Sequence, residues 1–101
     1  MENCTPKELQ VHLENSKSVF LKLWKPGCGA CKLSEPATRR LGEKHGDSYI
    51  FCQINADEHP EILSISESEV LPAFFVFKEG NMHAKIIGFK GIKKLQEALE
   101  N

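Results

Sequence analysis

The sequence predicts an α/β fold in which a four-stranded mixed sheet carries helices on both faces. Two observations lead to this prediction. Short runs rich in β-branched and aromatic residues alternate with longer runs whose apolar residues recur at helical spacing. The last two β-rich runs are separated only by the turn 79–81, which favours an antiparallel hairpin, whereas strands joined through helices are parallel.

The first predicted elements are a helix over about 6–15 and a strand over about 18–24. Thr5 is a candidate N-cap for this helix, followed by Pro6 at the first helical position and Glu8 at the capping-box position. The run "SVFLKLW" is almost continuously apolar, which is typical of a strand that is buried on both faces.

The middle of the chain is predicted to add a helix, a strand and a short helix. "KPG" ends the first strand, and helical spacing runs from Cys28 to about Lys44, with Pro36 expected to kink the helix near its second turn. "SYIFCQINA" predicts a strand over about 48–54, and "HPEILSISE" predicts a short helix over about 59–66.

The end of the chain is predicted to form the hairpin and a last helix. "PAFFVFKEGNMHAKIIGF" predicts strands at 73–78 and 83–89 around the turn. "KGIKKLQEALEN" follows as an amphipathic helix with one apolar face. That face consists of Ile92, Leu95, Ala98 and Leu99.

Length and composition predict one domain over residues 1–101, located in the cytoplasm. A net charge of −1 gives no electrostatic reason to expect nucleic acid or an anionic membrane as partner. No apolar run is long enough to cross a bilayer, and "MENCTPKELQ" lacks the pattern of a signal peptide. In the cytosol cysteines are usually reduced, so a CxxC pair there favours redox or metal chemistry over a structural disulfide.

The pair Cys28 and Cys31 is the main candidate for chemistry. The two residues share one face at the start of a predicted helix, where unpaired backbone N–H groups favour a thiolate. A thiolate at Cys28 would attack a disulfide, and Cys31 would resolve the mixed disulfide. Two alternatives are an inert reduced pair and an iron–sulfur cluster shared between two chains.

A zinc site is less favoured, and we expect neither a metal nor a cofactor. Closed zinc sites take four ligands, usually as two close pairs, and the chain has no second CxxC. Its histidines are scattered without metal-ligand spacing, at His12, His45, His59 and His83.

The two remaining cysteines are predicted to play no part in that chemistry. Cys52 lies in a mostly apolar predicted strand and is expected to be a small core residue. Cys4 is expected to be exposed near a frayed terminus. It would either have no role or be open to intermolecular disulfides and glutathionylation.

Several sequence landmarks, in order and at compatible spacings, resemble the thioredoxin family over about residues 17–101. They are "FLKLWKPGCGACK", Pro36, "INADEHP", "VLPAFFVFKEG" and Gly88. The resemblance implies the thioredoxin fold and a thiol–disulfide oxidoreductase that reduces protein disulfides. Cys28 would be its nucleophile and Cys31 its resolving thiol.

The resemblance also implies a docking surface and partners. A cis Leu71–Pro72 bond would lie beside the cysteine pair, and the backbone there would pair with the substrate as an added strand. The uncharged docking surface would comprise Trp24, Gly27, Gly29, Ala30, Leu71, Pro72 and Gly88. The protein would be a monomer that receives electrons from a thioredoxin-reductase-type flavoenzyme or from glutathione.

The sequence departs from the family pattern at several positions. The N-terminal strand of typical thioredoxins is expected to be absent or vestigial. Lys22 stands where the family usually has a buried aspartate, and Gln53 stands where it has the paired lysine. Gly27 replaces a tryptophan, and the CGPC sequence has become CGAC.

Lys22 is therefore a candidate for tuning the cysteine pair. A nearby ammonium group stabilises thiolates and makes the couple more oxidising, whereas a lysine that extends to solvent changes little. The alternatives to a reductase are an oxidant or isomerase and a redox-inactive adaptor. The intact CxxC argues against the adaptor.

Overall fold

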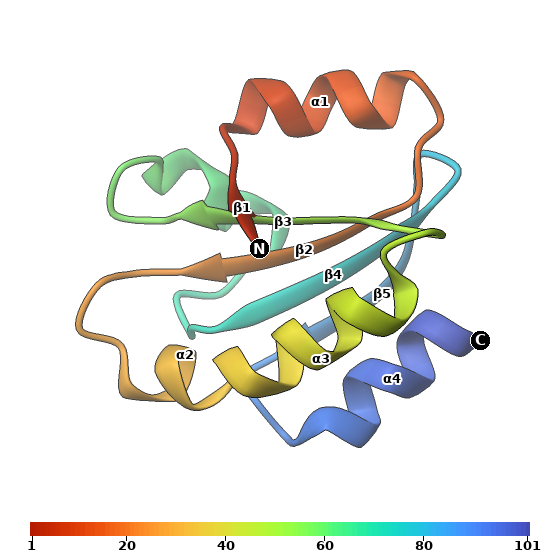
Figure 1. Ribbon diagram of the computed structural model, residues 1–101. Helices are drawn as coiled ribbons and strands as arrows, with labels where there is room; N and C mark the ends of the chain where they lie inside the picture. The colour runs from red at the N-terminus through yellow and green to blue at the C-terminus, as the bar shows by residue number, and fades with distance from the viewer.

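The β-rich runs of the sequence form one five-stranded sheet in the computed structural model, which describes all of residues 1–101 (Figure 1). The strands are β1 (Glu2–Asn3), β2 (Val19–Trp24), β3 (Ile50–Asn55), β4 (Ala73–Lys78) and β5 (Asn81–Ile87). The helices are α1 (Pro6–Glu14), α2 (Gly29–Leu33), α3 (Glu35–His45), α4 (Ile92–Glu100) and a 3₁₀ helix at Pro60–Ile65. None of the helices is both long and apolar enough to span a membrane.

The sheet has the strand order β1-β3-β2-β4-β5, with β2 in its centre. β2 runs parallel to β3 and antiparallel to β4, so the sheet is mixed as predicted. The predicted capping box also forms, because the Glu8 backbone N–H donates to Thr5 Oγ1 and the Thr5 N–H donates to Glu8 Oε1.

The sheet has five strands and not the predicted four, because the N-terminal strand, which was expected to be absent or vestigial, forms as a very short strand. β1 is two residues long, so no alternating pattern in the sequence revealed it, yet it pairs in parallel with β3. The Cys4 backbone N–H extends this pairing by donating to the Gln53 carbonyl at 2.8 Å. Cys4 is consequently half-buried, contrary to the expectation of an exposed thiol at a frayed terminus.

Two apolar clusters lie on opposite faces of the sheet. α1 and the 3₁₀ helix cover one face, and α3 and α4 cover the other (Figure 1). Alternation along β2 sends Leu21 and Leu23 to the α1 face and Phe20 to the opposite face. Lys22 is also buried, with only 2% of its surface exposed, and alternation places it on the same face as Phe20.

The single kinked helix predicted from Cys28 to Lys44 is two helices. α2 ends at Leu33 and α3 begins at Glu35, with Ser34 as the joint between them. Pro36 therefore lies in the first turn of α3, where its missing N–H group would have no intrahelical acceptor. The cysteine pair is therefore carried by a short helix that is separate from α3.

The hairpin forms at a shorter turn than predicted. β4 has the predicted bounds, whereas β5 begins at Asn81 and ends at Ile87 rather than covering 83–89. Glu79 and Gly80 both have positive φ angles, 52° and 86°, which suits a two-residue hairpin turn.

Candidate active site

Cys28 and Cys31 form a disulfide at the start of α2. Cys28 is the N-cap of this helix and is half-buried, whereas Cys31 is only 4% exposed. The Cys31 backbone N–H donates a hydrogen bond to Cys28 Sγ at 3.1 Å. One sulfur is thus accessible from solvent, and the other lies behind it against the protein.

The loop before β4 lies against the outer sulfur. The Leu71–Pro72 peptide bond is cis, and the Leu71 carbonyl oxygen is 3.8 Å from Cys28 Sγ. Gly88 joins this group because its N–H donates to the Pro72 carbonyl at 2.7 Å. Segments that are distant in the sequence therefore meet beside Cys28, as the family resemblance implied.

The remaining predicted docking residues surround the pair. Gly27, Gly29 and Ala30 are exposed, and Trp24 is half-buried. A Cβ atom at Gly29 would meet no atom within 4 Å, so the chain itself leaves that space open. Gly27 has a φ of +78°, a conformation that L-residues with a side chain rarely adopt.

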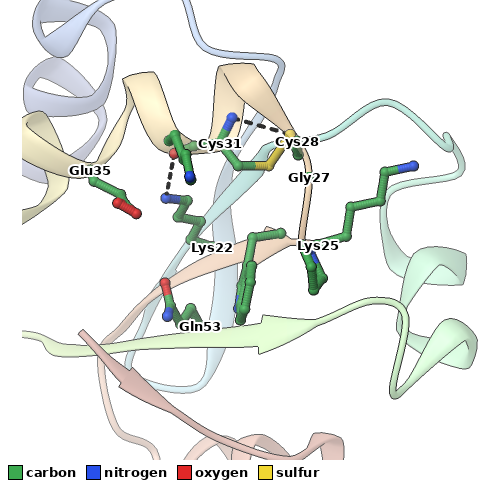
Figure 2. Close-up of a pocket in the computed structure, with 10 residues that line it drawn as sticks. Lys22, Lys25, Gly27, Cys28, Cys31, Glu35 and Gln53 are labelled. Atoms are coloured by element: carbon green, nitrogen blue, oxygen red, sulfur yellow. Dashed lines mark hydrogen bonds between the residues drawn. A yellow bond between two sulfur atoms is a disulfide. The ribbon is translucent and has the colours of Figure 1, made fainter.

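A cavity of about 140 Å³ opens beneath the cysteine pair (Figure 2). It is lined from β2, β3 and the two helices after β2, and both cysteines border it. Its polar lining consists of Lys22, Lys25, Lys32, Glu35 and Gln53. Figure 2 shows Lys22 and Glu35 beneath the helix that carries the cysteines, with Gln53 on the strand below.

Lys22 is held in this site and does not extend to solvent. Its ammonium group donates a hydrogen bond to the Cys31 carbonyl at 3.0 Å (Figure 2). Burial lowers the pKa of Lys22 below the ordinary lysine value, and the negative charge of Glu35 opposes this shift in part. The hypothesis of a lysine that reaches the surface is therefore wrong.

Ser34 is a site residue that the sequence analysis missed. Its side chain is fully buried, and its hydroxyl donates to the Cys31 carbonyl at 2.7 Å, the same acceptor that Lys22 uses. A serine two residues before a proline suggests a helix N-cap, but this hydroxyl makes no capping bond. The signal in the sequence was its position three residues after Cys31, where a hydroxyl reaches back to a carbonyl one turn earlier.

The sequence analysis also did not identify the exposed charged and apolar residues near the site. Val70, directly before Leu71, is 53% exposed, and Leu33 on α2 is 73% exposed. Lys25 and Lys32 border the cavity and give this end of the molecule positive charge. Trp24 Nε1 is buried without a hydrogen-bond partner in the protein.

The order of the elements, the cysteine pair at the start of α2 and the cis-proline loop beside it all agree with the family that the sequence resembles. The family model described as Thioredoxin matches residues 1–101. The chain belongs to the thioredoxin family. The match includes residues 1–16, which the sequence resemblance did not cover.

Two bacterial relatives match this chain over most of its length and over most of their own. Thioredoxin of Bacillus subtilis (strain 168) is 33% identical over 85 residues, which cover 83% of this chain and 82% of the relative. Thioredoxin of Alicyclobacillus acidocaldarius is 27% identical over 95 residues, which cover 94% of this chain and 90% of the relative.

Solved thioredoxin structures share the fold. Mitochondrial thioredoxin 3 of Saccharomyces cerevisiae, in its oxidised form, has a TM-score of 0.88 at 23% identity, covering 99% of this chain and 93% of that chain. A structure concerned with thiol resolution in a yeast mitochondrial 1-Cys peroxiredoxin via glutathione/thioredoxin systems has a TM-score of 0.87 at 22% identity, with the same coverage.

Family membership and the Cys28–Cys31 pair together define the activity. This thioredoxin-family protein is a thiol–disulfide oxidoreductase whose redox-active group is the CGAC disulfide. The redox-inactive adaptor is not favoured, because the pair that such an adaptor would lack is present and forms a disulfide.

Proposed function

We propose that this oxidoreductase reduces disulfides in other proteins, with Cys28 as the attacking thiol and Cys31 as the resolving thiol. The observation that carries the proposal is the unequal burial of the two sulfur-bearing residues at one helix start. A substrate sulfur can approach Cys28 from solvent, whereas Cys31 can reach only a sulfur already attached to Cys28.

The reaction would proceed by two thiol–disulfide exchanges from the reduced protein. The Cys28 thiolate attacks one sulfur of the substrate disulfide, the Cys28–substrate bond forms, and the substrate's own S–S bond breaks to release one thiolate. Cys31, after losing its proton, attacks Cys28 and releases the second substrate thiolate. The substrate gains two electrons, and the protein ends with the Cys28–Cys31 disulfide.

The backbone N–H of Cys31 supports the first step. It donates to Cys28 Sγ at 3.1 Å, and a hydrogen bond to sulfur favours the thiolate over the thiol. The Leu71 carbonyl, 3.8 Å from the same sulfur, lies where a reduced thiol can donate its proton in a weak hydrogen bond. The sulfur therefore has a stabilising partner in both protonation states.

Substrate would dock on the surface formed by Trp24, Gly27, Gly29, Ala30, Leu71, Pro72 and Gly88. Support comes from the open space around the glycines and from the position of the Leu71 carbonyl beside Cys28. An extended substrate segment placed against residues 70–71 would pair with exposed backbone and bring its disulfide to Cys28. Exposed Val70 adds apolar area at the edge of this surface.

Lys22 is proposed to tune the couple through charge. Its ammonium group donates a hydrogen bond to the Cys31 carbonyl. When Lys22 is protonated, its positive charge therefore acts on both sulfurs at short range. Positive charge stabilises the thiolates of the reduced form and raises the reduction potential. Because burial lowers the pKa of Lys22, the effect is strongest at low pH and fades as the lysine loses its proton.

The deciding experiment is the reduction potential of Cys28–Cys31, measured by Trp24 fluorescence in thiol–disulfide buffers. A potential below the cytosolic glutathione poise supports the reductase, and one above it identifies an oxidant or isomerase. Lys22→Met should lower the potential by on the order of 20 mV if the lysine charge acts on the pair. An unchanged potential would remove Lys22 from the proposal.

The electron donor is proposed to be a thioredoxin-reductase-type flavoenzyme or glutathione. The similar yeast structure comes from a setting in which glutathione/thioredoxin systems serve a peroxiredoxin, which makes both donors reasonable to test. The chain is proposed to work as a monomer in the cytosol. Stopped-flow reduction of the Cys28–Cys31 disulfide by each purified donor, gel filtration, and imaging of a tagged chain test these three points separately.

A further inference from the structure

The two cysteines outside the CGAC pair are brought together by strand pairing. Glu2 of β1 is the register partner of Cys52 in β3, and Cys4 follows two residues after Glu2. Side chains two residues apart along an extended chain share a face of the sheet. Cys4 and Cys52 therefore project to the same face, with the Cys4 backbone held by its bond to Gln53.

Both side chains belong to the core beneath α1. Cys52 is 3% exposed, and half-buried Cys4 packs against the cluster that contains Cys52. The neighbouring Cys52 thiol lowers the pKa of Cys4, against the opposing effects of burial and of the carboxylates of Glu2 and Glu8. The neighbouring Cys4 thiol, together with burial, raises the pKa of Cys52.

The sheet separates these two thiols from the CGAC disulfide. Cys52 pairs in register with Leu21, whose side chain lies in the core under α1. Lys22 and Gln53 are the next residues in each strand, and they border the cavity beneath Cys31 on the other face. Figure 1 shows α1 and α2 on opposite sides of the sheet, so direct exchange between the two cysteine pairs of one molecule is blocked.

We propose that Cys4 and Cys52 form a second dithiol–disulfide centre, which takes small disulfides such as glutathione disulfide as its oxidant. Cys4 is the entry thiol because it is the more exposed of the two and adjoins solvent-exposed β1. Cys52 resolves the mixed disulfide from within the core. This inference is independent of the direction of electron flow at Cys28–Cys31.

The oxidation balances in two exchanges. The Cys4 thiolate attacks glutathione disulfide, a Cys4–glutathione bond forms, and one glutathione thiolate leaves. Cys52 passes its proton to the glutathione thiolate that has left and attacks Cys4, so the Cys4–Cys52 bond forms and the second glutathione leaves as a thiolate. The two cysteines lose two electrons in total, and one glutathione disulfide becomes two glutathione molecules.

The resulting bond would fasten β1 to β3. It would close a long loop of the chain, and cross-links of that kind restrict the unfolded state and raise stability. Without it, β1 is held to the sheet by a two-residue pairing and the Cys4 backbone bond. The protein with the Cys4–Cys52 disulfide should therefore have a higher melting temperature than the protein with both thiols free.

The test uses the Cys28→Ser/Cys31→Ser variant, in which Cys4 and Cys52 are the remaining cysteines. The reduced variant is incubated with glutathione disulfide, alkylated and digested with trypsin without reduction. We expect a linked pair of peptides, 1–7 and 45–78, and loss of two hydrogen atoms from the intact mass. The melting temperature should rise by about 10 °C and return on reduction with dithiothreitol.

The controls are the same variant carrying Cys4→Ser or, separately, Cys52→Ala, both of which should show no linked peptide and no redox-dependent melting. Cys4→Ser changes the less buried residue, so it serves even if the core substitution prevents folding. Three results would overturn the proposal. They are two free thiols after incubation, a stable Cys4–glutathione adduct with Cys52 free, and a Cys4–Cys4 dimer.

Discussion

The protein holds two pairs of cysteines, and their surroundings differ in almost every respect. Cys28 and Cys31 are three residues apart at a helix start, beside an open surface and above a cavity lined by lysines. Cys4 and Cys52 lie far apart in the chain and meet under α1, packed in an apolar core. In the first pair Cys28 is accessible to large partners, whereas the second pair is reached only through Cys4 at the edge of the sheet.

The difference shows how burial divides roles between identical side chains. A thiol beside flat, open backbone can meet a disulfide on another protein, whereas a thiol within a core can meet only a small molecule or its neighbour. The charged groups near the two pairs also differ. Lys22 and Glu35 border the cavity beneath the first pair, whereas Glu2 and Glu8 act on Cys4 from the surface.

The largest expected effect on the rate of disulfide reduction comes from removing the Cys28 thiol. Cys28→Ser should lower the rate of protein-disulfide reduction by more than about a hundredfold, because the attacking sulfur is lost. Cys4→Ser is the matched control, since it removes a thiol of the other pair, and it should retain nearly the full rate. A turbidity assay of insulin reduction with dithiothreitol as donor measures both. Equal rates for the two variants would contradict the division of roles.

The second effect is on the free energy of unfolding, and it concerns the charge of Lys22 beneath the Cys28–Cys31 pair. Lys22→Met should raise the free energy of unfolding of the disulfide form by about 1 kcal/mol at pH 7, because a buried cation is replaced by an apolar side chain. Ser34 still donates to the Cys31 carbonyl in this variant. Denaturant titration of both proteins measures the difference.

The pH dependence of that difference has a definite sign. The pKa of Lys22 is lowered in the folded state, so above this pKa and up to the ordinary value of 10.5 the unfolded chain binds more protons than the folded one. Wild-type stability therefore rises with pH through this window relative to Lys22→Met. The advantage of the variant should shrink as pH approaches 10.5, and a constant difference would show that Lys22 carries no desolvation cost.

A third effect concerns the support of the buried pair. Thr5→Ala removes the side-chain cap of α1 directly after Cys4 and should lower the free energy of unfolding by about 1 kcal/mol. Disulfide reduction should stay at the wild-type rate, because Cys28 and Cys31 lie on the other side of the sheet. Paired denaturation and activity measurements test this, and a parallel loss of activity would mean that the two regions are coupled.

The smallest expected effect comes from a substitution on the docking surface that leaves the cysteines unchanged. Gly29→Ala adds a methyl group where the protein has no atom within 4 Å, so folding should be unaffected. Reduction of protein disulfides should fall about threefold, because the methyl group meets the partner's backbone. Reduction of a small aromatic disulfide should not change. Equal losses on both substrates would mean that Gly29 acts on the cysteines and not on docking.

Local sequence patterns predicted most of the fold and the centre of the site. The capping box of α1, the bounds of β4 and the position of Cys28 at a helix start all depend on residues within a few positions of one another. The joint at Ser34 was missed because the apolar spacing continues from α2 into α3, although a proline near its beginning favoured a break.

Short-range features of the chain, namely helix caps, turns and alternating strands, were enough to predict the redox pair, the elements that carry it and the family to which they belong. Only the tertiary structure showed two further contacts between groups that are distant in the chain. Pairing of β1 with β3 brings Cys4 to Cys52, and strand alternation directs Lys22 inward to the Cys31 carbonyl. Both contacts depend on how segments that are distant in the chain pair and pack, so the residues next to each group do not reveal its partner.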